Sequence, residues 1–168
     1  QITVAAKGDV NLENGYNESR DDYGLKYKER GLLSSKSTTI KSHDESKIVT
    51  ASTLSGDAVQ IIAGGNTNMT ASQVIGTHDV AISSGKDTSI SSAQEYERHD
   101  YAKQVKKSGL LSGGGLGFTI GTEKRKDQYR DADVLQKGST VGSISGNVTI
   151  TSDKDIHNAN NASQKEGD

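Results

Sequence analysis

VQIIAGGNTNMT, residues 59–70, is followed 21 residues later by VAISSGKDTSIS, residues 80–91, with the same order of residue types. In each stretch aliphatic residues alternate with polar ones, and a short Gly-containing turn separates two such runs. Alternation with a period of two is typical of β-strands and not of helices. The pattern has four copies, which begin near Ile2, Val59, Val80 and Val148. The chain is therefore predicted to be all-β.

Short strands that recur in this way cannot each bury an apolar face alone, so they are expected to stack into a solenoid. Small inward-facing side chains suit the interior of a parallel β-helix, and the crossover preference of parallel strands predicts a right-handed coil. The turns end in Asp or Asn, which favours side-chain-to-backbone hydrogen bonds. Stacked turns of this kind could also bind calcium, although the Gly-Gly-x-Gly-x-Asp repeat typical of that function is absent. These turn residues are Asp9, Asn66, Asp87 and Asp155.

A second period of 78 residues relates larger segments of the chain. Tyr23 recurs as Tyr101, and the run GLLS at 31–34 recurs at 109–112. Residues 1–168 are therefore predicted to form a single β-helix fragment made of a duplicated unit of about 78 residues, with a polar tail at 158–168. Because the chain begins within a strand pattern, we expect it to be a piece of a longer protein.

Two insertions interrupt the predicted coil, at residues 16–50 and 94–137. They hold 29 of the 42 charged residues, all six Tyr and the single Phe. Apolar and polar residues alternate in both insertions, and the GLLS turn lies between an outgoing and a returning arm. Each insertion is predicted to be a long β-hairpin that projects from the coil. Residues 123–137 also fit a helical face, which leaves a helix there as an alternative.

The composition argues against several classes of function. Only 30% of the residues are hydrophobic, and 20 Lys and Arg are balanced by 22 Asp and Glu. That balance argues against general nucleic-acid binding, so no nucleic acid is expected as a partner. No apolar run reaches the length of a transmembrane helix. The absence of Cys excludes disulfides and thiolate metal sites.

No catalytic, cofactor-binding or metal-binding residues are predicted. His43, His78 and His99 each precede an Asp, but the repeat places them at non-equivalent positions, so they are not expected to converge on one site. The Gly-rich run at 113–117 lacks the Gly-Lys-Ser/Thr of a phosphate-binding loop and is expected to be a hairpin tip.

The insertions carry the residues that are expected to form an interaction surface. A basic cluster is predicted where residues 124–126 face Lys103, Lys106 and Lys107 of the opposing arm. This cluster could meet lipid phosphates or an acidic glycan, or it could be a solvated mixed-charge surface that discourages edge pairing. The aromatic residues suit a binding face or cross-strand pairing. The candidate surface comprises Tyr23, Tyr27, Tyr96, Tyr101, Phe118, Lys124, Arg125, Lys126 and Tyr129.

The stretch KSGLLSGGGLGFTIGTEKRKDQ (107–128), followed by GSTVGSISGNVTITSDKDI (138–156), resembles the haemagglutinin-type repeat of large two-partner-secreted exoproteins. These exoproteins include filamentous-haemagglutinin-like adhesins and contact-dependent growth inhibition effectors. Through the 78-residue offset the resemblance extends to the first unit, where SSKS at 34–37 replaces the Gly-rich run. The resemblance implies β-helical filaments on the surface of Gram-negative bacteria, export through an outer-membrane barrel transporter, and repeats without catalytic residues.

The expected function is that of a non-catalytic module of a secreted, cell-surface filament. Its coils would supply a rigid shaft, and its hairpins would contact the envelope of a target cell and support toxin delivery. Two rivals remain open at this point. One is a β-helical enzyme that degrades polysaccharides, since a fold does not determine a function. The other is a passive spacer whose hairpins only cap and solubilise the coil.

Overall fold

The computed structural model describes residues 1–112 and 118–159, with the side chains at 111, 112, 118 and 119 outside the description. This part of the chain contains fifteen strands and no helix, which confirms the all-β prediction, and so it holds no helix that could span a membrane. It divides into two compact units. The first comprises residues 1–18, 47–96 and 134–159, and the second comprises residues 19–46 and the described residues of 97–133.

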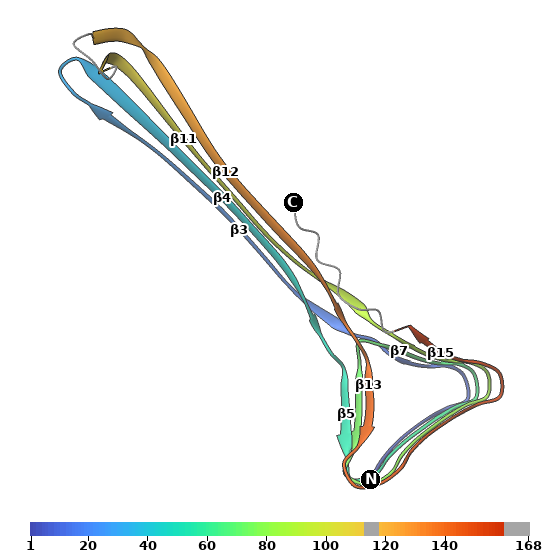
Figure 1. Cartoon of the computed structure of the whole chain (residues 1–168). Coiled ribbons are helices and arrows are strands. Elements are labelled where there is room, and N and C mark those ends of the chain that lie inside the picture. Colours follow the sequence, from blue (N-terminus) through green and yellow to red (C-terminus); the bar gives the residue numbers. More distant parts are fainter. Residues whose placement is uncertain (113–117, 160–168) are drawn as a thin grey trace. The chain divides into compact units, whose positions relative to one another are not determined.

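The first unit is built from three sheets, each made of parallel strands (Figure 1). In the first sheet Ile2 pairs with Val59, Val59 with Val80, and Val80 with Val148, which confirms the four copies found in the sequence. This sheet contains β1 (Ile2–Ala6), β6 (Val59–Ala63), β9 (Val80–Ser84) and β14 (Val148–Ser152). The second contains β2 (Val10–Leu12), β7 (Thr67–Thr70), β10 (Thr88–Ser91) and β15 (Ile156–Ala159). The third contains β5 (Thr53–Gly56), β8 (Gln73–Gly76) and β13 (Thr140–Ser143).

The chain visits the three sheets in a fixed order, the first, the second and then the third. Among the described strands, the step from the second sheet to the third is direct only between β7 and β8, through Ala71 and Ser72. At the other two steps a pair of long strands intervenes. These pairs are β3 (Gly15–Arg30) with β4 (Ser34–Thr50), and β11 (Ala93–Ser112) with β12 (Phe118–Lys137).

The core of the first unit is narrow and aliphatic. Ile61, Met69 and Ile82 are at most 1% exposed, and they pack within one cluster of buried residues. Three buried hydroxyl groups satisfy one another, because Ser84 Oγ donates to Thr67 Oγ1 at 2.6 Å and lies 2.7 Å from Thr88 Oγ1. Such pairing removes the cost of burying these groups among aliphatic side chains.

The turns between the first and second sheets stack into a ladder of side-chain hydrogen bonds. The backbone N–H of Asn66 donates to Asp9 Oδ1 at 2.7 Å, that of Asp87 donates to Asn66 Oδ1 at 3.2 Å, and that of Asp155 donates to Asp87 Oδ1 at 3.2 Å. The turn residues singled out in the sequence therefore cap the turn of the next copy, as the side-chain-to-backbone interpretation predicts.

We expect Asn66→Ala to lower the free energy of unfolding of the first unit by about 0.5–1.5 kcal/mol, because it removes the acceptor for the Asp87 N–H. Asn68→Ala is the matched control. The Asn68 side chain makes one hydrogen bond, to the side chain of Asn11 on the exposed side of the second sheet, and takes no part in the ladder. Chemical denaturation followed by circular dichroism measures both variants. Equal losses would contradict a specific role for the ladder.

Residues 123–137 lie within β12 as extended chain, so the helical alternative for this segment is wrong. The apolar spacing that also fits a helix belongs to a strand that is the neighbour of β11 in its sheet. The predicted polar tail begins inside β15, and its residues from 160 onward lie outside the described part of the chain, as does the predicted tip at 113–117.

Candidate functional site

The long strands of the two insertions form a single four-stranded sheet in the order β12, β11, β4, β3. We call this sheet the hairpin sheet. β4 is antiparallel to both of its neighbours, β3 and β11, because in the contacts between them the residue number falls on one strand as it rises on the other. The alternation of side chains between the two faces is unbroken across these contacts. They join Asp22 to His43, Glu29 to Lys36, Ser35 to Ser108, Asp44 to His99, and Asp100 to Arg130.

Residues of this sheet therefore sort to two faces by their position along each strand. One face holds the even-numbered residues of β3, β11 and β12 and the odd-numbered residues of β4. We call its outer part the cationic face. It is defined by seven exposed side chains: Lys26, Lys28, Arg30, Lys41, Lys106, Lys124 and Lys126. The opposite side, the tyrosine face, carries Tyr23, Tyr27, Tyr101 and Tyr129.

The charges of the cationic face are uncompensated. From Gly24 to the end of the sheet at which β3 turns into β4, the described residues of this face include no Asp or Glu. Within the described residues, none of the seven cations has an ion-pair partner. On the tyrosine face, by contrast, Lys36 pairs with Glu29 at 3.1 Å and Arg125 with Asp127 at 3.3 Å. The net charge of −2 thus conceals a clustered positive surface.

A groove of about 740 Å³ crosses the four strands at the base of the cationic face. His43, Asp100 and Arg130 line one side of it, and Lys41 and Gln128 line the other. Gly24 and Ala102 also line it, and their lack of long side chains leaves this space open. A second groove of about 250 Å³ adjoins the first and shares three of its lining residues, Lys41, Ala102 and Gln128.

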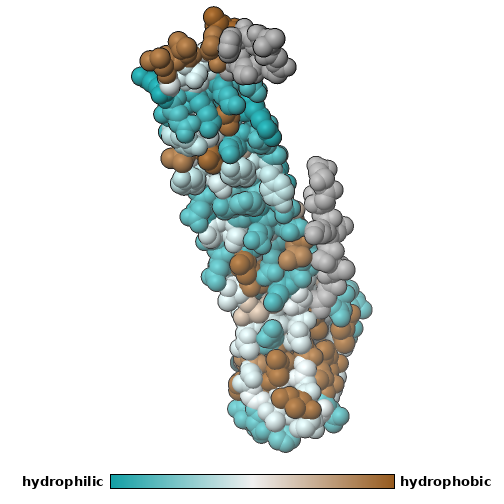
Figure 2. Space-filling model, turned by 60° about the vertical axis from the view of Figure 1, so that its left-hand side comes forward, coloured by the Kyte–Doolittle hydropathy of each residue, from teal (hydrophilic) through white to brown (hydrophobic). Residues whose placement is uncertain are grey.

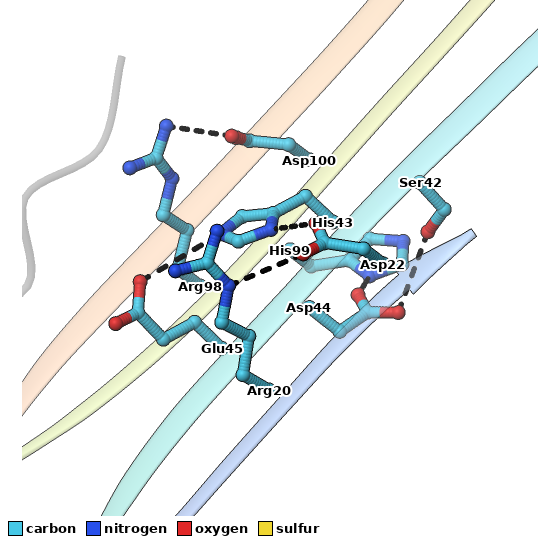
Figure 3. A network of polar contacts seen from close by, with 9 residues as sticks. All are labelled: Arg20, Asp22, Ser42, His43, Asp44, Glu45, Arg98, His99 and Asp100. Carbon is cyan, nitrogen blue, oxygen red and sulfur yellow. Dashed lines mark hydrogen bonds and ion pairs between the residues drawn. The ribbon is translucent and has the colours of Figure 1, made fainter. Parts of the chain in front are cut away.

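Beside the groove lies a network of charged side chains (Figure 3). His43 Nδ1 is 2.5 Å from Asp22 Oδ1, and Arg20 Nε donates to Asp22 Oδ2 at 3.2 Å. The hydrogen bond from His43, followed by that from Arg20, holds the pKa of Asp22 below its ordinary value. Glu45 completes this part of the network, 3.7 Å from His43 Nε2.

Asp100 is clamped by two arginines. Arg98 Nη2 lies 2.6 Å from Asp100 Oδ2, and Arg130 Nε lies 3.1 Å from Asp100 Oδ1. The hydrogen bond from Arg98 is the main cause that lowers the pKa of Asp100. A carboxyl that donates a proton in catalysis needs a raised pKa. The arrangement suits fixed ion pairs that hold the strands together and not acid catalysis.

We expect the second unit to lose stability below about pH 4. The pKa values of Asp22 and Asp100 are lowered from 3.8 in the folded state. Their contribution is therefore fully present above 3.8 and is lost as the pH falls through the lower folded values. Thermal melting between neutral and acidic pH measures this loss. Asp100→Asn should melt lower at neutral pH and depend less on pH, and an unchanged pH dependence would contradict the assignment.

Two of the three His–Asp dipeptides meet on neighbouring strands, although the sequence predicted no convergence. His99 Nδ1 hydrogen-bonds to Asp44 Oδ1, and Ser42 Oγ donates to Asp44 Oδ2 at 3.3 Å. The two sequence stretches meet because β4 and β11 are neighbours, which no local pattern reveals. Strand alternation nevertheless places their rings on opposite sides of the sheet. His43 lies beside the groove, and the ring of His99 lies 6.3 Å from that of Tyr129 on the tyrosine face. His78 lies apart, in the first unit, beside Asp57.

Three donor groups of the first unit could hold a metal ion. Side-chain atoms of Asp87, Asp155 and His157 lie within 4.8 Å of one another. Asp87 already accepts a hydrogen bond from the Asp155 backbone in the turn ladder, and Asp155 and His157 are exposed. In the described residues this is the one group of three or more His and acidic side chains with such spacing.

Apolar side chains gather at the end of the hairpin sheet, where Figure 2 shows hydrophobic atoms together. Leu32 and Leu33 of the turn between β3 and β4 are 100% and 68% exposed. Leu110 and Ile120, near the facing ends of β11 and β12, are 37% and 83% exposed. The Leu110 N–H donates to the Leu33 carbonyl at 3.0 Å, which places residues of both insertions in one apolar tip.

The residues predicted for the interaction surface do not form one cluster. Four of the tyrosines share the tyrosine face, whereas Tyr96 belongs to the first unit and the side chain of Phe118 lies outside the description. Lys124 and Lys126 lie on the cationic face, whereas Arg125 lies on the tyrosine face. The predicted surface did not include four cations of the first insertion, Lys26, Lys28, Arg30 and Lys41. Their alternate spacing, as in Lys26-x-Lys28-x-Arg30, is the signal that could have found them.

The chain matches a family model described as "Hemagglutinin repeat" over residues 31–160. A 16S rRNA endonuclease CdiA of Enterobacter cloacae is 38% identical over 163 residues, which cover 93% of this chain and 5% of that protein. A tRNA nuclease CdiA-2 of Burkholderia pseudomallei is 34% identical, with 92% and 5% covered. A tRNA nuclease CdiA of Escherichia coli O6:K15:H31 is 37% identical, with 79% and 4% covered. No solved structure gives a significant match.

The chain spans about 5% of the length of these relatives. The matched region is the repeat region and not a nuclease domain. The family model covers most of the chain, and the three relatives match 79–93% of it. The chain therefore belongs to the haemagglutinin-repeat family of two-partner-secreted exoproteins, which includes the contact-dependent growth inhibition effectors.

Proposed function

We propose that this chain is a non-catalytic module of a secreted Gram-negative surface protein that acts in contact-dependent growth inhibition. Its three parallel sheets are the sides of a right-handed parallel β-helix, which serves as a rigid shaft. The observation that carries this proposal is the in-register pairing of strands that begin at Ile2, Val59, Val80 and Val148. Parallel strands visited in a fixed order need a crossover at each step, and such crossovers are right-handed in nearly all proteins.

The long parent protein leaves its cell through an outer-membrane barrel transporter of the two-partner type. This part of the proposal rests on the family, whose members share that route of export. The nuclease activity in the relatives' names is not assigned to this chain, because the match covers about 5% of each relative.

The rival function is that of a polysaccharide-degrading enzyme, which would release reducing ends from its substrate. If the chain released reducing ends and Asp87→Asn abolished that release, the result would favour this rival.

The hairpin sheet makes the contact with the envelope of the target cell. Two exposed features support this role. The apolar tip presents Leu32, Leu33 and Ile120 to solvent, and exposed apolar patches commonly mark interaction sites. The cationic face lies on the same sheet and would attract the anionic groups of an outer membrane. A passive spacer has no need of either feature.

Co-sedimentation with outer-membrane vesicles tests this proposal. The first protein is the full chain, and the second has residues 16–50 and 94–137 replaced by short links patterned on Ala71–Ser72, the direct step between β7 and β8. Circular dichroism must first show that both are folded and rich in strands. We expect vesicles to bind the full chain and not the shortened one. If neither binds, the passive spacer is the better account.

A further inference from the structure

We propose that the cationic face binds an acidic polysaccharide, a chain of sugars that carry carboxylate or phosphate groups, laid along the hairpin sheet. This inference deepens the proposed function, on which it rests, by naming the class of ligand in the target envelope. It concerns the seven side chains of the cationic face and the two adjoining grooves, and it does not involve the apolar tip.

The spacing of the cations suits a chain of regularly placed negative charges. Lys26, Lys28 and Arg30 follow one another at every second position of β3, which places them about 7 Å apart along the strand. Lys124 and Lys126 repeat this spacing on β12, at the other edge of the sheet. No carboxylate lies among these cations. Asp22 and Asp100 line the larger groove at the base of the face, but both are already paired with arginines. A polyanion therefore gains several charge contacts at once and displaces no ion pair of the seven cations.

The uncharged side chains of the same face suit the hydroxyl groups of sugars. Thr39 and Gln104 line the second groove, and Gln128 lines both grooves. Hydroxyl and amide groups donate and accept hydrogen bonds, as sugar hydroxyls do. The combined grooves, about 740 and 250 Å³, are large enough for an extended oligosaccharide, since small-molecule sites commonly span about 300–1,000 Å³.

Two other anionic partners, a single-stranded nucleic acid and a lipid bilayer, fit this surface less well. Proteins that bind single-stranded nucleic acid stack bases on aromatic rings, and the alternation places the tyrosines of this sheet on the opposite side. A lipid bilayer is held by apolar side chains beside the basic ones. Below the tip, the described residues of the cationic face carry no apolar side chain larger than that of Ala102.

Binding to polygalacturonate tests the inference, because fully methyl-esterified polygalacturonate has the same sugar backbone without the charges. We expect the full chain to bind polygalacturonate and not its ester, and affinity to fall at least about tenfold between about 50 mM and 500 mM salt. Equal binding to both polymers would overturn the inference. Binding to phosphatidylglycerol vesicles or to single-stranded DNA, without binding to polygalacturonate, would also overturn it.

A matched pair of variants separates this surface from general charge attraction. The cationic-face variant is Lys26→Gln, Lys28→Gln, Lys124→Gln and Lys126→Gln. The control removes the same number of charges from outside the site. Lys36→Gln, Lys107→Gln and Arg125→Gln lie on the tyrosine face, and Lys137→Gln lies in the first unit. We expect the first to weaken polygalacturonate binding by at least about tenfold and the control by less than about threefold. Equal losses would overturn the inference.

The two proposals fail in different ways. If the full chain binds polygalacturonate but not outer-membrane vesicles, the cationic face stands and the envelope contact fails. If it binds vesicles but not polygalacturonate, the envelope contact stands and the polysaccharide site fails. All variants are compared after thermal melting has shown that they fold. If the cationic-face variant does not fold, it is replaced by its two double variants, one on β3 and one on β12.

Discussion

Ile61→Ala is expected to lower the free energy of unfolding of the first unit by about 2–5 kcal/mol. Ile61 is fully buried in the core cluster, where its side chain contacts the interior residues of successive copies. Removing most of that side chain loses the free energy of burial and leaves a cavity. The parallel sheets share one narrow core, so few neighbouring side chains are available to fill the cavity.

The next residue along β6 supplies the control. Ile62 has the same side chain as Ile61 but is 39% exposed, since it points away from the core. Ile62→Ala should change the free energy of unfolding by about 0.5 kcal/mol or less, as is usual for surface positions. Chemical denaturation of both variants measures the difference. Because a register shift by one residue exchanges the two faces of a strand, a larger loss in Ile62→Ala would contradict the register of the first sheet.

The first unit was largely predictable from the sequence because its structure is determined by short-range repetition. The 21-residue pattern gives the strands, their alternation gives the buried residues such as Val59 and Ile82, and equivalent positions pair with one another. The turn ladder was also predictable, since Asp9 and Asn66 occupy the same position in consecutive copies and cap the next turn. The right-handed β-helix itself stays a prediction.

The hairpin sheet was less predictable because its surfaces depend on pairing between distant strands. The alternation of Lys124 and Lys126 is visible in the sequence, but their meeting with Lys26 and Lys28 on one face requires β4 and β11 to be neighbours. That pairing joins two insertions whose sequences contain no signal of contact. The overall balance of charge gives no sign of this surface either, since it hides a face on which no described carboxylate neutralises the cations.

Leu32→Ser combined with Leu33→Ser is expected to reduce co-sedimentation with phospholipid vesicles at least about tenfold. Both side chains are exposed at the tip of the hairpin sheet, and burial of a Leu side chain contributes about 1.5–3 kcal/mol. Partial insertion of both into a membrane would thus account for more than a tenfold change in affinity. The fold should tolerate the double variant, since neither side chain packs against the core.

Ile48→Ser combined with Ile144→Ser is the matched control, because these residues are 53% and 76% exposed but belong to the first unit. We expect it to leave vesicle binding unchanged. If both double variants bind as the full chain does, the apolar tip makes no membrane contact. If the tip variant no longer co-sediments with vesicles but still binds polygalacturonate, the hairpin sheet makes two separable contacts. One is apolar, at its tip, and the other is electrostatic, along its cationic face.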